Sequence, residues 1–146
     1  MSSAGNYKTN AVILYDGVCG LCNRSVRFVL KHDREGVFRF ASLQSAAARA
    51  ILARHGLTPD ALDTFYVVAD FGLAGERVLS KSAAAIYTAE TLGGIWKAAR
   101  ILSILPRRVR DWAYDIVARH RYRIFGKYDA CPLPEARYRD RFIDLN

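Results

Sequence analysis

The sequence predicts one domain, 1–146, with a mixed α/β fold built around a central four-stranded mixed sheet and followed by extra C-terminal helices. Three observations support this prediction. The chain has 146 residues, 51% of them hydrophobic, so it can bury a core without disulfide bonds. Short apolar runs rich in strand-forming residues alternate with segments of helical periodicity. Glycine, proline and Asp-Gly turn signals separate these segments.

The first half of the core reads as strand, helix, strand and helix. The run AVILY predicts a strand that ends at Asp16-Gly17. Apolar residues at roughly helical spacing then predict a helix that Gly36 stops. VFRFA alternates like a second strand. Ser42 is expected to cap the alanine-rich helix LQSAAARAILARH, which Gly56 closes.

The second half of the core reads as a strand hairpin and a helix. TFYVVAD predicts an apolar strand, FGLAG a turn and ERVLS a shorter strand. Ser80 or Ser82 can cap the helix AAAIYTAETL, which Gly93-Gly94 ends. The core, about residues 11–92, therefore has the element order of a thioredoxin-like domain: a parallel strand pair with a right-handed crossover, and an antiparallel hairpin added to the same sheet.

Beyond the core, the sequence predicts a helical extension at about 95–125 and an irregular tail at 126–146. Pro106 divides the extension into two helices, at roughly 95–105 and 107–122. We expect the second helix to pack on the domain through one apolar stripe, which consists of Val109, Trp112, Ala113, Ile116 and Val117.

The formal charge is +8, from 22 Lys and Arg against 14 Asp and Glu, and the excess lies late in the chain, in LPRRVRDW, ARHRYRIFGK and EARYRDRF. One interpretation is an anionic partner, such as nucleic acid or a membrane surface. We favour a solvated arginine face with its aromatic residues packed inward, because no nucleic-acid motif accompanies the charge. If so, changing Arg119 and Arg121 to Gln should leave thiol chemistry intact.

The stretch YDGVCGLCNRS places Cys19 and Cys22 at a strand-to-helix turn. Side chains three residues apart in a first helical turn can form a reversible disulfide if the turn tightens slightly. A thiolate at a helix N-terminus meets unpaired N–H groups and the positive end of the helix dipole, which lower its pKa. We therefore predict that Cys19, open to solvent, is the attacking thiol and that Cys22, more shielded, is the resolving thiol.

Asp16 has two interpretations. It can cap the turn or the helix through its carboxylate, or it can act as the base that takes the proton of Cys22 when a mixed disulfide is resolved. Cys131, the third cysteine, is interpreted as a packing residue that anchors the tail, in preference to a third redox thiol.

Other functions compete with thiol-disulfide exchange. The pair could be inert buried thiols, or half of a zinc site, but the residues that could complete four ligands, Cys131, His32, His55 and His120, are not paired at ligand spacing. The chain could also be a non-enzymatic binding module that uses its basic C-terminal helical face. We expect a redox function with neither cofactor nor metal, and no specific nucleic-acid partner.

The N-terminus is polar and lacks the apolar stretch of a signal peptide. No run approaches the roughly 20 apolar residues of a membrane span, since Lys97 and Arg100 interrupt the nearest one. We therefore expect no transmembrane segment and a cytoplasmic location. The sequence carries no signal for an oligomeric state.

Taken together, YDGVCGLCNRSVRF, VFRFASLQS, SKSAAAIYTAETLGG and ARHRYRIFGKYDACPLP resemble the DCC family, small predicted thiol-disulfide oxidoreductases named for an Asp-x-x-Cys-x-x-Cys motif. Asp16, Cys19 and Cys22 match this motif, and the resemblance covers nearly the whole chain. It implies a thioredoxin-like fold and redox activity on a protein or small-molecule thiol or disulfide.

One feature departs from better-known thioredoxin-like enzymes. Those enzymes resemble one another in a cis-proline directly before the third core strand, which helps to bind an extended substrate. Here that place reads ALDTF, with Asp63-Thr64 and no proline, and Pro59 comes several residues too early. Either the substrate loop is built differently, or general dithiol exchange is not the function.

Overall fold

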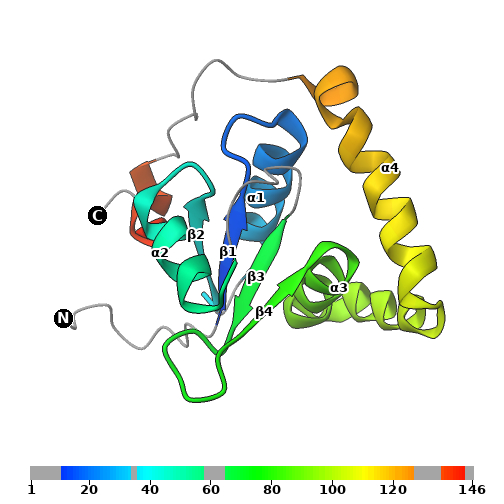
Figure 1. Cartoon of the computed structure of the whole chain (residues 1–146), viewed down its shortest axis with the longest axis horizontal. Coiled ribbons are helices and arrows are strands. Elements are labelled where there is room, and N and C mark those ends of the chain that lie inside the picture. Colours follow the sequence, from blue (N-terminus) through cyan, green and yellow to red (C-terminus); the bar gives the residue numbers. More distant parts are fainter. Residues whose placement is uncertain (1–10, 34–35, 58–64, 127–135, 144–146) are drawn as a thin grey trace.

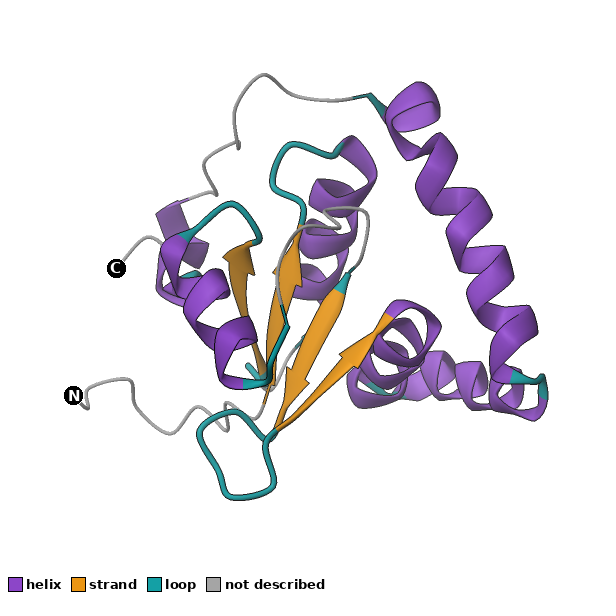
Figure 2. Cartoon of the chain, in the orientation of Figure 1, coloured by secondary structure: helices purple, strands orange, loops and turns teal. Residues whose placement is uncertain are grey.

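The computed structural model describes residues 11–33, 36–57, 65–126 and 136–143. Four strands form one sheet, with helices on both faces (Figures 1 and 2). The elements, in chain order, are β1 Ala11–Tyr15, α1 Gly20–His32, β2 Phe38–Ser42, α2 Ala46–Arg54, β3 Tyr66–Ala69, β4 Arg77–Ser80, α3 Lys81–Leu92, the 3-10 helix η1 Gly94–Ile104, α4 Arg107–Phe125 and the 3-10 helix η2 Ala136–Arg141.

The sheet has the strand order β2-β1-β3-β4. β1 pairs with β2 in parallel, with Ile13 opposite Phe40, and with β3 in antiparallel register, with Ile13 opposite Val67. β4 pairs with β3 in antiparallel register. This topology confirms the predicted fold class, a mixed α/β thioredoxin-like core followed by C-terminal helices.

β1 is one of the two inner strands, and all five of its residues are buried. Because side chains alternate across a strand, Ile13 and Tyr15 pack with α1 and α3 on one face of the sheet. Val12 and Leu14 pack with α2 on the other face. β1 is therefore packed on both faces of the sheet up to Tyr15. This packing defines where the turn that follows the strand begins.

One helix cap differs from the predicted one, and Ser80, which is the N-cap residue of α3 as predicted, lacks the side-chain hydrogen bond of a cap. Ser45, not Ser42, caps α2: its Oγ accepts a hydrogen bond of 3.2 Å from the N–H of Ala48. Ser42 is instead the last residue of β2. Ser80 stands at the start of α3 but makes no side-chain cap hydrogen bond, and the hydroxyl of Ser82 donates to Asp111 in α4 at 2.5 Å. α2 therefore keeps a local serine cap three residues later than predicted, whereas at α3 a tertiary contact with α4 takes the hydroxyl of Ser82.

The prediction that α4 packs through its apolar stripe is wrong. The large side chains of that stripe are between 38% and 65% exposed, and Ala113 is exposed as well. A polar face points inward instead. Tyr114 Oη accepts a hydrogen bond of 2.9 Å from the N–H of Phe65 at the start of β3, and Asp115 pairs with Lys81 at 3.0 Å. α4 therefore docks on the domain through polar contacts. Its side chains accept a hydrogen bond from a backbone N–H and form an ion pair with a lysine of α3.

None of the helices in the described ranges combines the length and the apolar composition that crossing a bilayer requires.

Candidate active site

The two cysteines of the CxxC motif lie at the N-terminus of α1. Cys19 is the N-cap residue, with extended backbone, and its Sγ accepts a hydrogen bond of 3.4 Å from the N–H of Cys22. Both are free thiols, and they approach each other to 3.3 Å. The pair is therefore close enough to exchange a proton or to form a disulfide after a small adjustment.

The turn between β1 and α1 is held by its own polar groups. The N–H of Cys19 donates to the carbonyl of Asp16 at 3.2 Å. Asn23, buried one turn into α1, donates from Nδ2 to the carbonyls of Gly17 at 2.8 Å and Cys19 at 2.9 Å. A buried side-chain amide that satisfies two carbonyls fixes the backbone around the thiols. Asn23 is not among the residues that the sequence predicts for the site.

The two thiols differ in acidity. The pKa of Cys19 falls to about 6, chiefly because the Cys22 thiol hydrogen-bonds to it, with further help from backbone N–H groups and the charge of Arg121, and in spite of burial. The pKa of Cys22 is raised far above its ordinary value, because its thiol donates to Cys19, because it is buried, and because the Cys19 thiolate repels a second charge. At neutral pH one proton is thus shared between two sulfurs, and Cys19 carries the negative charge.

The exposure of the pair is the reverse of the predicted one. Cys19 is 0% exposed, and Cys22 is partly exposed. The cause is the end of α4, which lies against the N-terminus of α1. Gly126, directly after α4, accepts a hydrogen bond of 3.0 Å from the N–H of Gly20. The prediction of a solvent-open Cys19 is therefore wrong, because a segment about 100 residues away in the sequence covers the turn.

Asp16 is buried and accepts hydrogen bonds from three elements. Its Oδ1 accepts from Val18 N–H at 3.2 Å and from Gln44 Nε2 at 2.7 Å. Its Oδ2 accepts from the hydroxyl of Tyr122 and forms an ion pair of 3.0 Å with Arg121 Nη2. The carboxylate thus joins the turn after β1, the segment after β2 and α4.

Gln44 completes the connection to β2. The parallel pairing of β1 and β2 brings both C-terminal ends to one edge, where Leu43 N–H donates to the carbonyl of Tyr15 at 2.7 Å. Gln44 Oε1 accepts from Gly17 N–H at 3.0 Å and from the hydroxyl of Ser42. Gln44 therefore orients both the backbone and the carboxylate beside the cysteines.

Arg121 was assigned from the sequence to a solvated face, and this assignment is wrong. The residue is 5% exposed and lies between Asp16 and the thiols, with Nη1 3.8 Å from Cys22 Sγ. Its Nη2 also donates to Tyr122 Oη at 3.1 Å. Burial alone would lower the pKa of the guanidinium, but the nearby thiols, Tyr122 and Asp16 raise it, so Arg121 stays protonated.

Tyr122 is the other α4 residue at the site. Burial and the hydrogen bond to Asp16 raise the pKa of its phenol, so the hydroxyl remains a donor. A set of polar residues at helical spacing in α4 is the signal that could have identified this face from the sequence. These residues are Asp111, Tyr114, Asp115, Arg121 and Tyr122.

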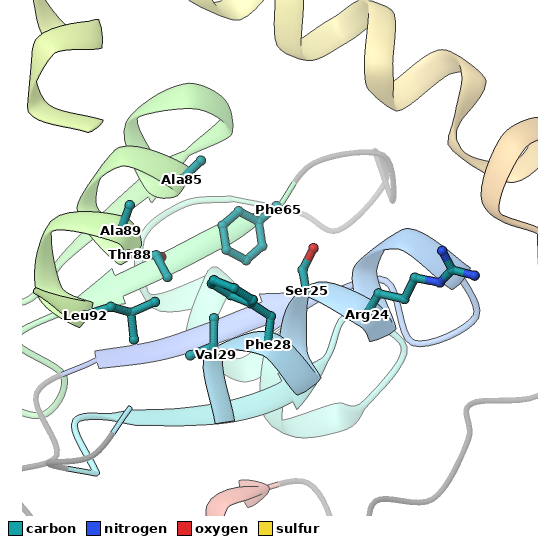
Figure 3. Close-up of a pocket in the computed structure, with 9 residues that line it drawn as sticks. All are labelled: Arg24, Ser25, Phe28, Val29, Phe65, Ala85, Thr88, Ala89 and Leu92. Atoms are coloured by element: carbon teal, nitrogen blue, oxygen red, sulfur yellow. The ribbon is translucent and has the colours of Figure 1, made fainter. Parts of the chain in front are cut away.

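A cavity of about 410 Å³ opens beside the cysteine helix, between α1 and α3 (Figure 3). Ser25, which lines it, lies one helical turn after Cys22. In Figure 3, Phe28 and Phe65 lie close together at its centre, and Arg24 marks one end. The complete lining is Arg24, Ser25, Phe28, Val29, Phe65, Ala85, Thr88, Ala89 and Leu92.

Some predicted features lie outside the described residues. These are Cys131 and the loop with Pro59, Asp63 and Thr64 that replaces the cis-proline segment. In the part of the chain that the structure describes, no group of three or more His, Cys, Asp or Glu side chains is placed to hold a metal ion.

Comparisons with known proteins agree with the motif. A model of the DCC1-like thiol-disulfide oxidoreductase family matches residues 13–127. The uncharacterized protein YuxK of Bacillus subtilis (strain 168) is 39% identical over 134 residues, which are 92% of this chain and 94% of YuxK. A chloroplastic DCC family protein of Arabidopsis thaliana is 37% identical over 123 residues, 84% of this chain and 69% of that protein. No solved structure matches the chain at a significant level.

Proposed function

This chain belongs to the DCC1-like thiol-disulfide oxidoreductase family, and from this premise we propose that it is an enzyme that cycles Cys19 and Cys22 between dithiol and disulfide. The observation that supports the proposal best is the asymmetry of the pair. One thiol has a pKa of about 6, and its neighbour, 3.3 Å away, holds the remaining proton. A nucleophile that is ionised at neutral pH beside a protonated partner is what thiol exchange requires.

The reaction takes two displacement steps. The Cys19 thiolate attacks one sulfur of a substrate disulfide, so that the bond from Cys19 to substrate forms, the substrate S–S bond breaks, and the leaving thiolate takes a proton from water. Cys22 then loses its proton and attacks Cys19 Sγ, which releases the second substrate thiol. The substrate gains two electrons, and the enzyme is left as a disulfide. An external thiol reductant returns it to the dithiol by the same steps in reverse.

Arg121 has a defined role in the second step. Its guanidinium lies 3.8 Å from Cys22 Sγ, so it stabilises the Cys22 thiolate as that thiolate forms. The buried Asp16 carboxylate holds Arg121 in place through the ion pair of 3.0 Å. Asp16 is also a candidate acceptor for the Cys22 proton, and Asp16→Asn is the variant that tests this role.

The substrate meets the site from the side of Cys22, the partly exposed member of the pair, and the end of α4 must move away from Gly20 before a substrate sulfur can reach Cys19. The apolar cavity between α1 and α3 begins one turn from Cys22 and is suited to an apolar group of a peptide or small thiol. The cytoplasmic location that the sequence predicts would keep the dithiol as the resting form.

The experiment is a redox titration of the full chain against glutathione, with the Cys19–Cys22 disulfide measured by mass spectrometry. We expect a reversible two-electron transition and turnover in a small-disulfide assay. Cys19→Ser should abolish turnover, and Cys22→Ser should trap a mixed disulfide on Cys19. Cys131→Ser is the matched control and should shift the potential by less than about 30 mV. Wild-type turnover by Cys19→Ser would disprove the proposal.

A further inference from the structure

The exposed apolar side chains of this protein are concentrated in one segment. Among the described residues, twelve large hydrophobic side chains are exposed, and nine of them lie between positions 101 and 124. A monomeric protein rarely leaves so many apolar groups together in water without a partner for them. The nine are Ile101, Leu102, Ile104, Leu105, Val109, Trp112, Ile116, Val117 and Ile124.

Within α4 these residues form one face, which we call the outer apolar face: Val109, Trp112, Ile116, Val117 and Ile124. Their spacing of three, four and eight residues keeps them on the same side of a helix. The opposite side carries the polar groups that contact Ser82, Phe65, Lys81 and the cysteine turn. α4 lies at the outer edge of the molecule, so the outer apolar face points away from the sheet (Figure 1).

The same segment is strongly basic. Residues 94–125 contain eight Lys and Arg against two Asp, a formal charge of +6. Arg108, Arg119 and Arg123 are exposed beside the outer apolar face. This positive charge favours a negatively charged binding partner. A second copy of this chain would bring an equally positive face against it, and like charges across an interface oppose association.

We propose that η1 and the outer apolar face of α4 bind the surface of a membrane that contains anionic lipids. A helix with Trp and branched aliphatic residues on one side and arginines along its flanks has the composition of an interfacial helix. An anionic bilayer supplies an apolar layer beneath a negative surface in one partner, which matches both properties of the segment. A protein partner would have to combine an acidic and an apolar surface to do the same.

Binding through the outer apolar face also sets the position of the cysteine turn relative to the membrane. Arg121 and Tyr122 lie on the inner side of α4, against Asp16 and Cys22. With the outer apolar face on lipid, the cysteine turn lies across the helix from the membrane, about 10 Å from it, because that is the diameter of an α-helix. The inference does not depend on the redox proposal, since it uses none of the thiols.

The test is flotation of the full chain with vesicles, comparing phosphatidylcholine alone with phosphatidylcholine that contains phosphatidylglycerol. We expect binding to the anionic vesicles only, and weaker binding at high salt. Trp112→Ser with Ile116→Ser, and separately Arg119→Gln with Arg123→Gln, should each lower the partition coefficient at least about tenfold. All four positions are exposed, so thermal unfolding and thiol titration should match the wild type.

The matched control is Leu73→Ser, an exposed apolar residue in the turn between β3 and β4, which lies away from α4 in Figure 1. It should bind vesicles as the wild type does. No binding to the anionic vesicles, or equal binding by the two double variants, would overturn the proposal. So would a dimer, seen by light scattering, that Trp112→Ser with Ile116→Ser abolishes, because that result would assign the outer apolar face to a second copy.

Discussion

At the scale of single residues, the division of one proton between two sulfurs is the central property of the site. Cys19 is ionised because Cys22, backbone N–H groups and Arg121 all stabilise its charge. Cys22 remains protonated because a second charge beside the first would be repelled. The position of Cys19 at the helix N-terminus predicted the direction of its pKa shift, and its role as the attacking thiol stays a prediction. This position did not predict Arg121, whose contribution comes from 99 residues away.

The pH dependence of alkylation tests this division. A lowered pKa means that the thiolate is present above about pH 6 and is lost as the pH falls through that value. We expect the rate of Cys19 modification by iodoacetamide, measured by mass spectrometry, to rise with a midpoint near 6 and then level off. Cys22 should react only at alkaline pH. A Cys19 midpoint at the ordinary thiol value, about 8.5, would contradict the interpretation.

Arg121 and Arg119 form a matched pair for mutation, because one is buried against Asp16 and the other is exposed. Arg121→Gln leaves a buried carboxylate without its ion-pair partner, and we expect a loss of about 3 kcal/mol in the free energy of unfolding, with slower thiol exchange. Arg119→Gln should change that free energy by less than about 0.5 kcal/mol. Urea unfolding measures both. Equal effects would mean that Arg121 belongs to a solvated face after all.

Asp16→Asn and Tyr122→Phe separate the two roles of Asp16. If the carboxylate takes the Cys22 proton, only Asp16→Asn slows resolution, and a mixed disulfide accumulates near neutral pH while attack by Cys19 is normal. If Asp16 only anchors α4, both variants loosen the helix and both slow resolution, since Tyr122→Phe removes the hydroxyl that donates to Asp16 and Asp16→Asn removes the charge that pairs with Arg121. Quenched-flow mass spectrometry of the mixed disulfide distinguishes the outcomes.

At the scale of elements, the strands and core helices were predictable because their signals are local. β1 matched its predicted bounds, and α1 ends at His32, before the Gly36 that was expected to stop it. α4 was predicted as a helix, but with the wrong face inward. An apolar stripe predicts the buried side of a helix only when burial of apolar area decides the packing. Here the deciding contacts are polar and long-range, to Phe65, Ser82 and Asp16, and the spacing of polar residues in α4 marks the face that makes them but not their partners.

Tyr114→Phe tests the docking of α4. The variant removes the acceptor for the N–H of Phe65, a half-buried residue directly before β3, and keeps the ring. A buried donor left unsatisfied costs about 1–3 kcal/mol, so at this half-buried position we expect a loss of about 1 kcal/mol in the free energy of unfolding. Trp112→Phe, a larger change in volume at a position that is 65% exposed, should cost less than about 0.5 kcal/mol. If the Trp112 variant proves the more costly in urea unfolding, α4 packs by the apolar stripe.

At the scale of the whole molecule, the sheet topology and α4 together create the site. Parallel pairing brings the ends of β1 and β2 to one edge, which places Gln44 beside Asp16. α4 then closes this edge from outside, with Arg121 at the thiols and Gly126 on the first N–H of α1. The fold class could be predicted from element order alone. The closure could not, because it joins residues about 100 positions apart.

Because α4 is held partly by the charge of the thiols, its docking should depend on the redox state. Arg121 is stabilised by the negative charge on the cysteine pair, and a disulfide carries no charge. We therefore expect amide hydrogen exchange in the C-terminal half of α4 to be faster in the oxidised protein than in the dithiol form. Exchange in α2, on the other face of the sheet, should be the same in both and serves as the control.

By thermodynamic linkage, Arg121 should in turn affect the redox equilibrium of the cysteine pair. If the dithiol form holds Arg121 more tightly, then Arg121 stabilises the dithiol form and makes the pair more oxidising. Arg121→Gln should thus move the reduction potential of Cys19 and Cys22 to a more negative value, by about 30 mV for each 1.4 kcal/mol of lost stabilisation. Arg119→Gln should leave the potential unchanged. Both are measured by glutathione titration. A positive shift in the Arg121 variant, or equal exchange of α4 in the two redox states, would show that the helix does not respond to the charge on the thiols.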